Sequence, residues 1–169
     1  MAVILTAVGE DRPGLTQSLA DAIHQAGGNW LESHFARLGG QYVGSVLVEL
    51  PGERLSELEQ AVRSAQGSGF TVNILPASGE AIPVGQPFSF EIVGEDRLGI
   101  VKEISATLAS LDVNIEDLET STEDSAMFGA KLFRARANVL VPSEIPLDQV
   151  RDVLERISGE IMVDFEEAS

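Results

Sequence analysis

The chain has 169 residues, of which 44% are hydrophobic and 22% charged, a composition typical of a folded protein with one medium or two small domains. It contains no cysteine, which excludes disulfides and cysteine-ligated metal, and its net charge of −16 works against direct binding of nucleic acid. The first residues, MAVILTAVGED, have no basic residue ahead of a short apolar run, so we expect a cytoplasmic protein without a membrane span.

The first half begins with an apolar strand, followed at residues 8–14 by VGEDRPG and then by an amphipathic helix. Pro13 suits the first helical turn, and Gly27 and Gly28 suit the end of the helix. The apolar stripe of this helix consists of Leu15, Leu19, Ile23 and Ala26. Two strands, a second helix and a short strand are predicted to follow, at residues 30–38, 41–50, about 55–65 and 70–75.

The same pattern returns 85 residues later, where residues 93–99 read VGEDRLG. Two strands, a helix and a final strand are predicted at residues 115–121, 131–141, 147–157 and 161–165. The offset rises from 85 to 91 at Pro51 and Pro142, which leaves about six extra residues in the second hairpin, around STEDSAMFGA. An acidic hairpin of this kind is either a docking loop or a solvated tip, and we assign it no function.

The order βαββαβ, written twice, predicts the α+β class with two ferredoxin-like domains, each an antiparallel sheet with both helices on one face. We expect the first domain at residues 1–78, a linker rich in Pro, Gly and Ala at 79–86, and the second domain at 87–169.

Strand alternation predicts which side chains of the first and third strands face each core. The expected core residues are Val3, Leu5, Ala7, Tyr42, Gly44, Val46 and Val48 in the first repeat, and Phe88, Phe90, Ile92, Phe133, Ala135, Ala137 and Val139 in the second. The opposite faces carry Ile4, Thr6, Val8, Val43, Ser45 and Leu47 in the first repeat, and Ser89, Glu91, Val93, Arg134, Arg136 and Asn138 in the second. We therefore expect the first repeat's face to be covered and the second repeat's face to be wetter.

The repeated loop is the candidate ligand site. Its NH groups lie at the positive end of a helix dipole and favour a carboxylate, while Gly14 and Gly99 leave room for close approach. Asp11 and Asp96 could bind an ammonium group, and Asn29 and Asn114, at the far end of the helix, offer both donors and an acceptor, so together these residues suit a small zwitterion. A purely structural interpretation stays open, in which the acid caps the helix, the arginine pairs with a nearby acid and the glycine serves the turn.

Signals for catalysis are weak. The two histidines, His24 and His34, do not recur at the 85-residue offset, and a metal site with Glu32 is less favoured than surface or core roles for both. The sequence GEDRPG lacks the spacing and lysine of a phosphate-binding loop. We expect no enzyme activity and no cofactor.

The βαββαβ order, with DRPGL opening the helix and an Asn-apolar pair after it, resembles the ACT domain, a regulatory module that binds amino acids between paired domains. Two such domains, with GGNWLES in the first and LFRARANVLVP in the second, are similar to the glycine cleavage system transcriptional repressor family over residues 1 to about 167. The ligand-binding residues that this resemblance implies are Asp11, Arg12, Pro13, Gly14, Leu15 and Asn29 in the first repeat, and Asp96, Arg97, Gly99, Ile100 and Asn114 in the second. Leu98 departs from the pattern. Pro13 fixes the backbone of the first loop, whereas Leu98 leaves the backbone of the second loop freer.

The resemblance also implies a protein that senses a small amino acid, glycine among the candidates, and acts through contact with a protein partner such as a DNA-binding regulator. Two alternatives are an interaction adaptor without a ligand and a regulatory subunit of an amino-acid enzyme. A homo-oligomer is compatible with each of them.

Overall fold

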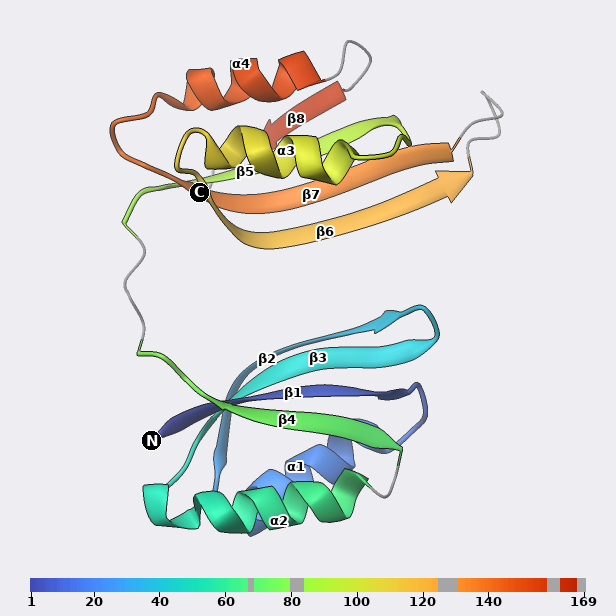
Figure 1. Ribbon diagram of the computed structural model, residues 1–169, viewed down its shortest axis with the longest axis vertical. Coiled ribbons are helices and arrows are strands. Elements are labelled where there is room, and N and C mark those ends of the chain that lie inside the picture. The colour runs from blue at the N-terminus through green and yellow to red at the C-terminus, as the bar shows by residue number, and fades with distance from the viewer. Residues whose placement is uncertain (67–68, 80–83, 125–130, 158–161, 167–169) are drawn as a thin grey trace. The chain divides into compact units, whose positions relative to one another are not determined.

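The computed structural model describes residues 1–66, 69–79, 84–124, 131–157 and 162–166. The chain divides into two compact units, Met1–Glu80 and Ala81–Ser169, and each has the element order βαββαβ (Figure 1). The predicted α+β class with two ferredoxin-like domains is therefore confirmed. Of the expected linker at 79–86, residues 80–83 lie outside the described residues.

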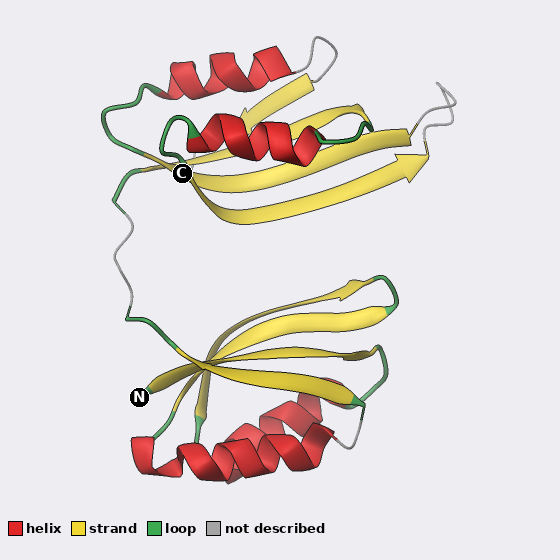
Figure 2. Ribbon diagram, in the orientation of Figure 1, coloured by secondary structure: helices red, strands yellow, loops and turns green. Residues whose placement is uncertain are grey.

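The first domain is a four-stranded antiparallel sheet in the order β2-β3-β1-β4, with both helices on one face (Figure 2). Its elements are β1 (Ala2–Glu10), α1 (Leu15–Gln25), β2 (Asn29–Leu38), β3 (Gln41–Glu49), the short 3₁₀ helix η1 (Gly52–Arg54), α2 (Leu55–Gln66) and β4 (Phe70–Pro76). Strand β1 thus lies in the middle of the sheet, and its carboxyl end leads directly into the candidate loop.

The second domain repeats this arrangement in the order β6-β7-β5-β8. Its elements are β5 (Gln86–Glu95), α3 (Ile100–Ala109), β6 (Asn114–Asp124), β7 (Lys131–Val141), α4 (Leu147–Ile157) and β8 (Met162–Glu166). Strand β6 continues to Asp124, beyond the predicted end near residue 121, because it pairs with β7 as far as Lys131. The remaining six residues of the longer hairpin, 125–130, lie outside the described residues.

Each domain has its own apolar core between the sheet and the helices, and the predicted alternation of the strands is confirmed. The alternate residues of β1 (Val3, Leu5, Ala7) and of β5 (Phe88, Phe90, Ile92) are all at most 3% exposed. The predicted stripe of α1 is buried as well, and full burial of one such side chain contributes about 1.5–3 kcal/mol. Within the described residues, no helix combines the length and apolar character needed to cross a membrane.

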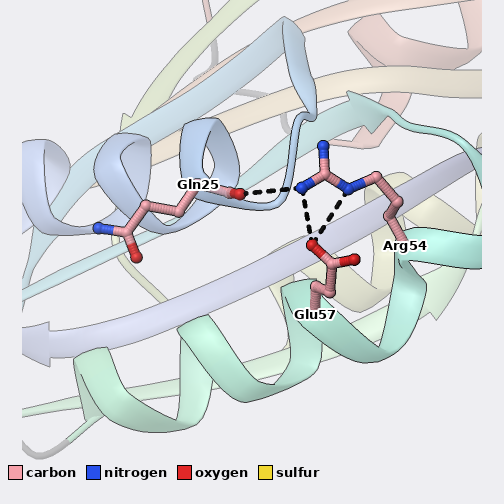
Figure 3. Close-up of polar contacts among 3 residues, drawn as sticks. All are labelled: Gln25, Arg54 and Glu57. Atoms are coloured by element: carbon pink, nitrogen blue, oxygen red, sulfur yellow. Dashed lines mark hydrogen bonds and ion pairs between the residues drawn. The ribbon is translucent and has the colours of Figure 1, made fainter.

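Helix α1 ends where the sequence predicts, at Gly27. This residue has φ of +68°, and the NH groups of Gly27 and Gly28 donate to the carbonyls of His24 and Ile23, the bonding pattern of a Schellman motif. Arg54, the last residue of η1 directly before α2, donates to the carbonyl oxygen of Gln25 at 3.4 Å and to Glu57 at 2.7 Å (Figure 3). A cation therefore sits at the negative end of α1 and ties it to α2.

The Arg54–Glu57 pair has a defined pH dependence. The hydrogen bond from Arg54 lowers the pKa of the Glu57 carboxyl, and the same bond raises the pKa of the Arg54 guanidinium. The lowered pKa belongs to the folded state. The Arg54–Glu57 pair therefore stabilises the fold at pH values above the ordinary carboxyl pKa, and this stabilisation is lost as the pH falls through the lowered pKa of Glu57. Both groups are exposed to solvent, so the contribution is small.

Helix α3 ends with the same backbone geometry but without a glycine. Asp112 has φ of 53°, the left-handed conformation that Gly27 adopts 85 residues earlier. The NH of Asp112 donates to the carbonyl of Ala109, and the NH of Val113 donates to the carbonyl of Leu108. An L-residue at this position is strained, because its Cβ approaches the following carbonyl oxygen.

We expect Asp112→Gly to raise the free energy of unfolding by about 0.5–1 kcal/mol, since it removes this strain. The matched control is Ser110→Gly, two residues earlier in right-handed helical backbone (φ −67°), which should lower stability by a similar amount. Urea denaturation of the full chain measures both changes. A loss of stability in Asp112→Gly would show that the aspartate side chain contributes more than its backbone strain costs.

The two open sheet faces, opposite the helices, differ as the sequence predicts. In the first domain, Ile4 lies beside Leu47 on β3 and Leu75 on β4. In the second domain Glu91 pairs with both Arg134 and Arg136, and Ser89 donates to the Oδ1 of Asn138. The first face is aliphatic, whereas the second is charged and polar.

An aliphatic face of this kind is expected to be covered by the second half of the chain, by a second copy of the chain or by a protein partner. Replacing Val43 and Leu47 together by glutamate should therefore change the oligomeric state, solubility or melting temperature of the chain. The matched control replaces Arg134 and Asn138, which occupy the equivalent positions opposite Val93 and Ser89, by glutamine and aspartate. If light scattering, thermal melts, solubility and partner binding all show no effect of the first pair, the face is solvent-exposed.

Candidate functional site

A cavity of about 580 Å³ lies at the loop between β1 and α1, within the size range of small-molecule sites. Its lining residues are Asp11, Arg12, Pro13, Gly14, Leu15, Thr16, Gln17 and Tyr42. The loop residues singled out in the first repeat thus all line one cavity, and Tyr42 joins them from β3.

The start of α1 depends on Gly14. This residue is the N-cap with φ of 92°, and no side chain caps the helix. Among the described residues, the NH groups of Leu15, Thr16 and Gln17 have no recorded acceptor, as expected for the first turn of an α-helix. A Cβ at position 14 would meet nothing within 4 Å, so the space beside these donors is open.

Pro13 was predicted in the first helical turn, and this prediction is wrong. The helix begins at Leu15, and Pro13 lies in the turn before the N-cap. The fixed φ of proline suits that turn as well as it suits a helix, so the sequence alone does not separate the two positions.

The two charged residues of the loop contact other parts of the first domain. The Oδ2 of Asp11 lies 3.1 Å from the Nε of Arg37, near the end of β2. Arg12 extends toward the turn before β4, where a Cβ added to Gly69 would come within 3.1 Å of Arg12 Nη2. Asp11 is therefore not a helix cap, and its carboxylate stays partly exposed at the pocket, 37% by side chain.

Tyr42 forms the wall of the pocket opposite the loop. Its hydroxyl lies 3.0 Å from the Oγ1 of Thr16, and its ring stacks on Phe35 with centroids 5.1 Å apart and an interplanar angle of 12°. Phe35 stacks in turn on Trp30. This arrangement requires Gly44 opposite Phe35, because an added Cβ there would overlap the phenyl ring.

Sequence reasoning did not identify Thr16, Gln17 or Tyr42 as site residues. Tyr42 was predicted to face the core, and its ring is indeed half-buried, but its hydroxyl reaches the pocket. The register of β3 could have identified Tyr42, because this residue lies opposite Gly9 at the end of β1, next to the loop.

The second loop has the same backbone but different surroundings. Gly99 is again an N-cap without a side-chain cap, with φ of 87°. The NH of Asp96 donates to Lys131, and Arg97 Nη2 donates to the carbonyl of Ile157 at the end of α4 (3.2 Å) and to Glu103. Leu98 is fully exposed.

Asn29 and Asn114 lie away from the loops of their own domains. Each opens the strand that follows the first helix, and the 11 residues of α1 put about 16 Å between Gly14 and Asn29 at 1.5 Å per residue. Both asparagines are exposed. A small ligand at Gly14 would therefore not reach Asn29 of the same domain.

The histidines show no catalytic grouping. His34 Nε2 lies 3.4 Å from Glu32 Oε1, and both side chains are largely exposed. Across the described ranges, no three His, Cys, Asp or Glu side chains are grouped as metal ligands.

Two βαββαβ domains, each with a glycine N-cap in front of its first helix, define a duplicated ferredoxin-like protein whose candidate site is a strand-to-helix loop. The ACT-domain family model matches residues 2–74, from β1 to β4. A solved structure of an unknown protein from Galdieria sulphuraria is 31% identical, with a TM-score of 0.85, and the match covers 99% of this chain and 98% of that one. The chain belongs to the ACT-domain family.

A second solved structure, of a candidate glycine cleavage system transcriptional repressor, is similar over 99% of this chain and 98% of that chain. Its TM-score is 0.74 at 17% identity, which shows a shared fold with two domains in tandem. No curated protein matches the sequence.

Proposed function

We propose that this chain is a cytoplasmic, non-catalytic regulatory protein that binds a small amino acid, glycine among the candidates, and acts through contacts with other proteins. The observation that carries this proposal is the pocket at the start of α1, where open space, free helix donors and a carboxylate meet. The helix donors suit the carboxylate of a zwitterion, the carboxylate of the pocket suits its ammonium group, and the open space admits the ligand.

The ligand carboxylate would lie at the NH groups of the first turn of α1. These donors need an acceptor, and the helix dipole favours a negative charge beside them. The ligand ammonium would lie at Asp11, whose carboxylate is partly exposed at the pocket. Gly14 keeps the approach to both groups clear because it has no side chain.

The regulatory output would pass through a protein partner. A net charge of −16 disfavours direct contact with DNA or RNA, so a role in gene regulation requires a separate DNA-binding protein. A role in transcriptional control of amino-acid metabolism is supported by the tandem fold shared with the candidate glycine cleavage repressor. The alternative of a ligand-free adaptor is favoured by one observation, the fully exposed Leu98 in the second loop.

A thermal-shift screen of the full chain against the free amino acids tests the proposal. A ligand at one hundred times its dissociation constant adds about 2.7 kcal/mol to the stability of the domain that binds it, and the melting temperature should rise accordingly. If no amino acid raises it, the adaptor becomes the better interpretation.

Gly14→Leu tests where the ligand binds, because a leucine side chain would fill the open space beside the NH groups of the first turn of α1. The same change also costs about 1–2 kcal/mol of backbone strain at φ of 92°. The matched control is Gly99→Leu, which carries the same strain at φ of 87° but leaves the first pocket intact. In calorimetry, Gly14→Leu should abolish binding of the amino acid found in the screen, and unchanged affinity would move the site elsewhere.

Asn29→Ala tests the asparagine that the family resemblance implies. Loss of one polar contact should weaken binding by about 1 kcal/mol if an asparagine from a second molecule completes the site. The effect should then depend on protein concentration, which calorimetry at two concentrations measures. Unchanged affinity at both would restrict the site to the pocket at α1.

A further inference from the structure

We propose that the first domain alone recognises the amino acid, and that Thr16 and Tyr42 make its pocket selective for a ligand whose side chain forms hydrogen bonds. This inference rests on the function proposed above and adds to it the number of sites and the class of ligand, and it removes glycine from the candidates because glycine has no side chain.

The two hydroxyl groups form a recognition pair at the wall of the pocket. Thr16 Oγ1 and Tyr42 Oη lie 3.0 Å apart, and either can donate to the other. Their mutual bond uses one of two protons, so one donor and several acceptor positions stay available to a ligand. A ligand hydroxyl or amide can therefore both donate to this pair and accept from it. An aliphatic side chain would displace the water bound to the pair without replacing the hydrogen bonds to that water.

The position of Tyr42 is fixed by its aromatic neighbours. Its ring is stacked on Phe35, Phe35 is stacked on Trp30, and Gly44 leaves the space in which Phe35 lies. A hydroxyl on a rigid ring loses little freedom when a ligand binds, and such preorganisation increases selectivity. The backbone of Thr16 is fixed by the first turn of α1, and the bond to Tyr42 orients its hydroxyl.

The second domain lacks both hydroxyls at the corresponding positions. Gly9 is opposite Tyr42 in the first sheet, and Gly94 is opposite Phe133 in the second. Thr16 corresponds to Val101 at the 85-residue offset. Tyr to Phe and Thr to Val are near-isosteric changes that remove only the hydroxyls, and Phe133 is 4% exposed within the core.

The charged residues of the second loop also differ in their contacts. Arg97 is held by Glu103 and by the end of α4. The position of Arg37, opposite Tyr42, is taken by Thr122, opposite Phe133, so the partner that orients Asp11 has no counterpart. The second loop keeps the backbone and the charged side chains of the first, but the hydroxyls and the arginine around the first loop have no counterpart there.

Calorimetry of the full chain with isosteric ligand pairs tests this proposal. The probes are L-serine against L-2-aminobutyrate and L-threonine against L-valine, two pairs in which a methyl group takes the place of the hydroxyl. Wild type should bind the hydroxyl member of each pair about fivefold to tenfold more tightly, the range of one or two partly exposed hydrogen bonds, with one ligand per chain.

The variants are Thr16→Val, Tyr42→Phe and the double variant, which give the first domain the side chains of the second. Each should lose the preference for the hydroxyl ligands, with a melting temperature close to that of wild type because shape is conserved. Val101→Thr in the second domain is the matched control and should change neither preference nor stoichiometry.

The possible outcomes separate the two proposals. If wild type binds amino acids but treats the isosteric pairs alike, or if the double variant keeps the preference, the recognition pair is wrong while the proposed function stands. Two ligands per chain, reduced to one by Gly99→Leu, would overturn the single site. Failure of every amino acid to bind would overturn the proposed function and this inference together.

Discussion

The left-handed glycine at the start of each first helix is the constraint on which the candidate site depends. Gly14 and Gly99 have φ of 92° and 87°, a region that an L-residue enters only with strain. This backbone turns the chain from the central strand into the helix without a side-chain cap. The NH groups of the first turn of α1 are left for solvent or a ligand, and the missing Cβ of Gly14 leaves the space in which a ligand can reach them.

Because this constraint is a property of the backbone, both repeats keep it, and the side chains around it decide what each loop can do. In the first domain the loop is surrounded by a carboxylate held by Arg37 and by the hydroxyls of Thr16 and Tyr42. In the second domain Arg97, which corresponds to Arg12, contacts the end of α4, and no hydroxyl replaces Tyr42. Identical folds have therefore acquired different surfaces at the same place.

The fold could be predicted from the sequence because it depends on periodic patterns. Strand alternation and helical stripes mark the buried faces, and the 85-residue offset supports each assignment with a second copy. The site could be predicted only where it is contiguous, from Asp11 to Leu15. Tyr42 was missed because its half-buried ring fits the core pattern. The position of its hydroxyl at the pocket follows from the register between β1 and β3, which the sequence does not state. Asn29 was grouped with Gly14 on the chemistry of its side chain and on the family resemblance, and the length of α1 separates the two residues.

The carboxylate of Asp11 connects the structural and the functional interpretations of the loop. Its ion pair with Arg37 joins the loop to edge strand β2, and this is a structural role. The same carboxylate faces the pocket and is the one acidic side chain among the lining residues. A ligand ammonium would therefore share Asp11 with Arg37, so binding and the attachment of the loop to β2 would involve the same charge. The two interpretations need not compete, because an acid already oriented by an arginine is preorganised for a cation.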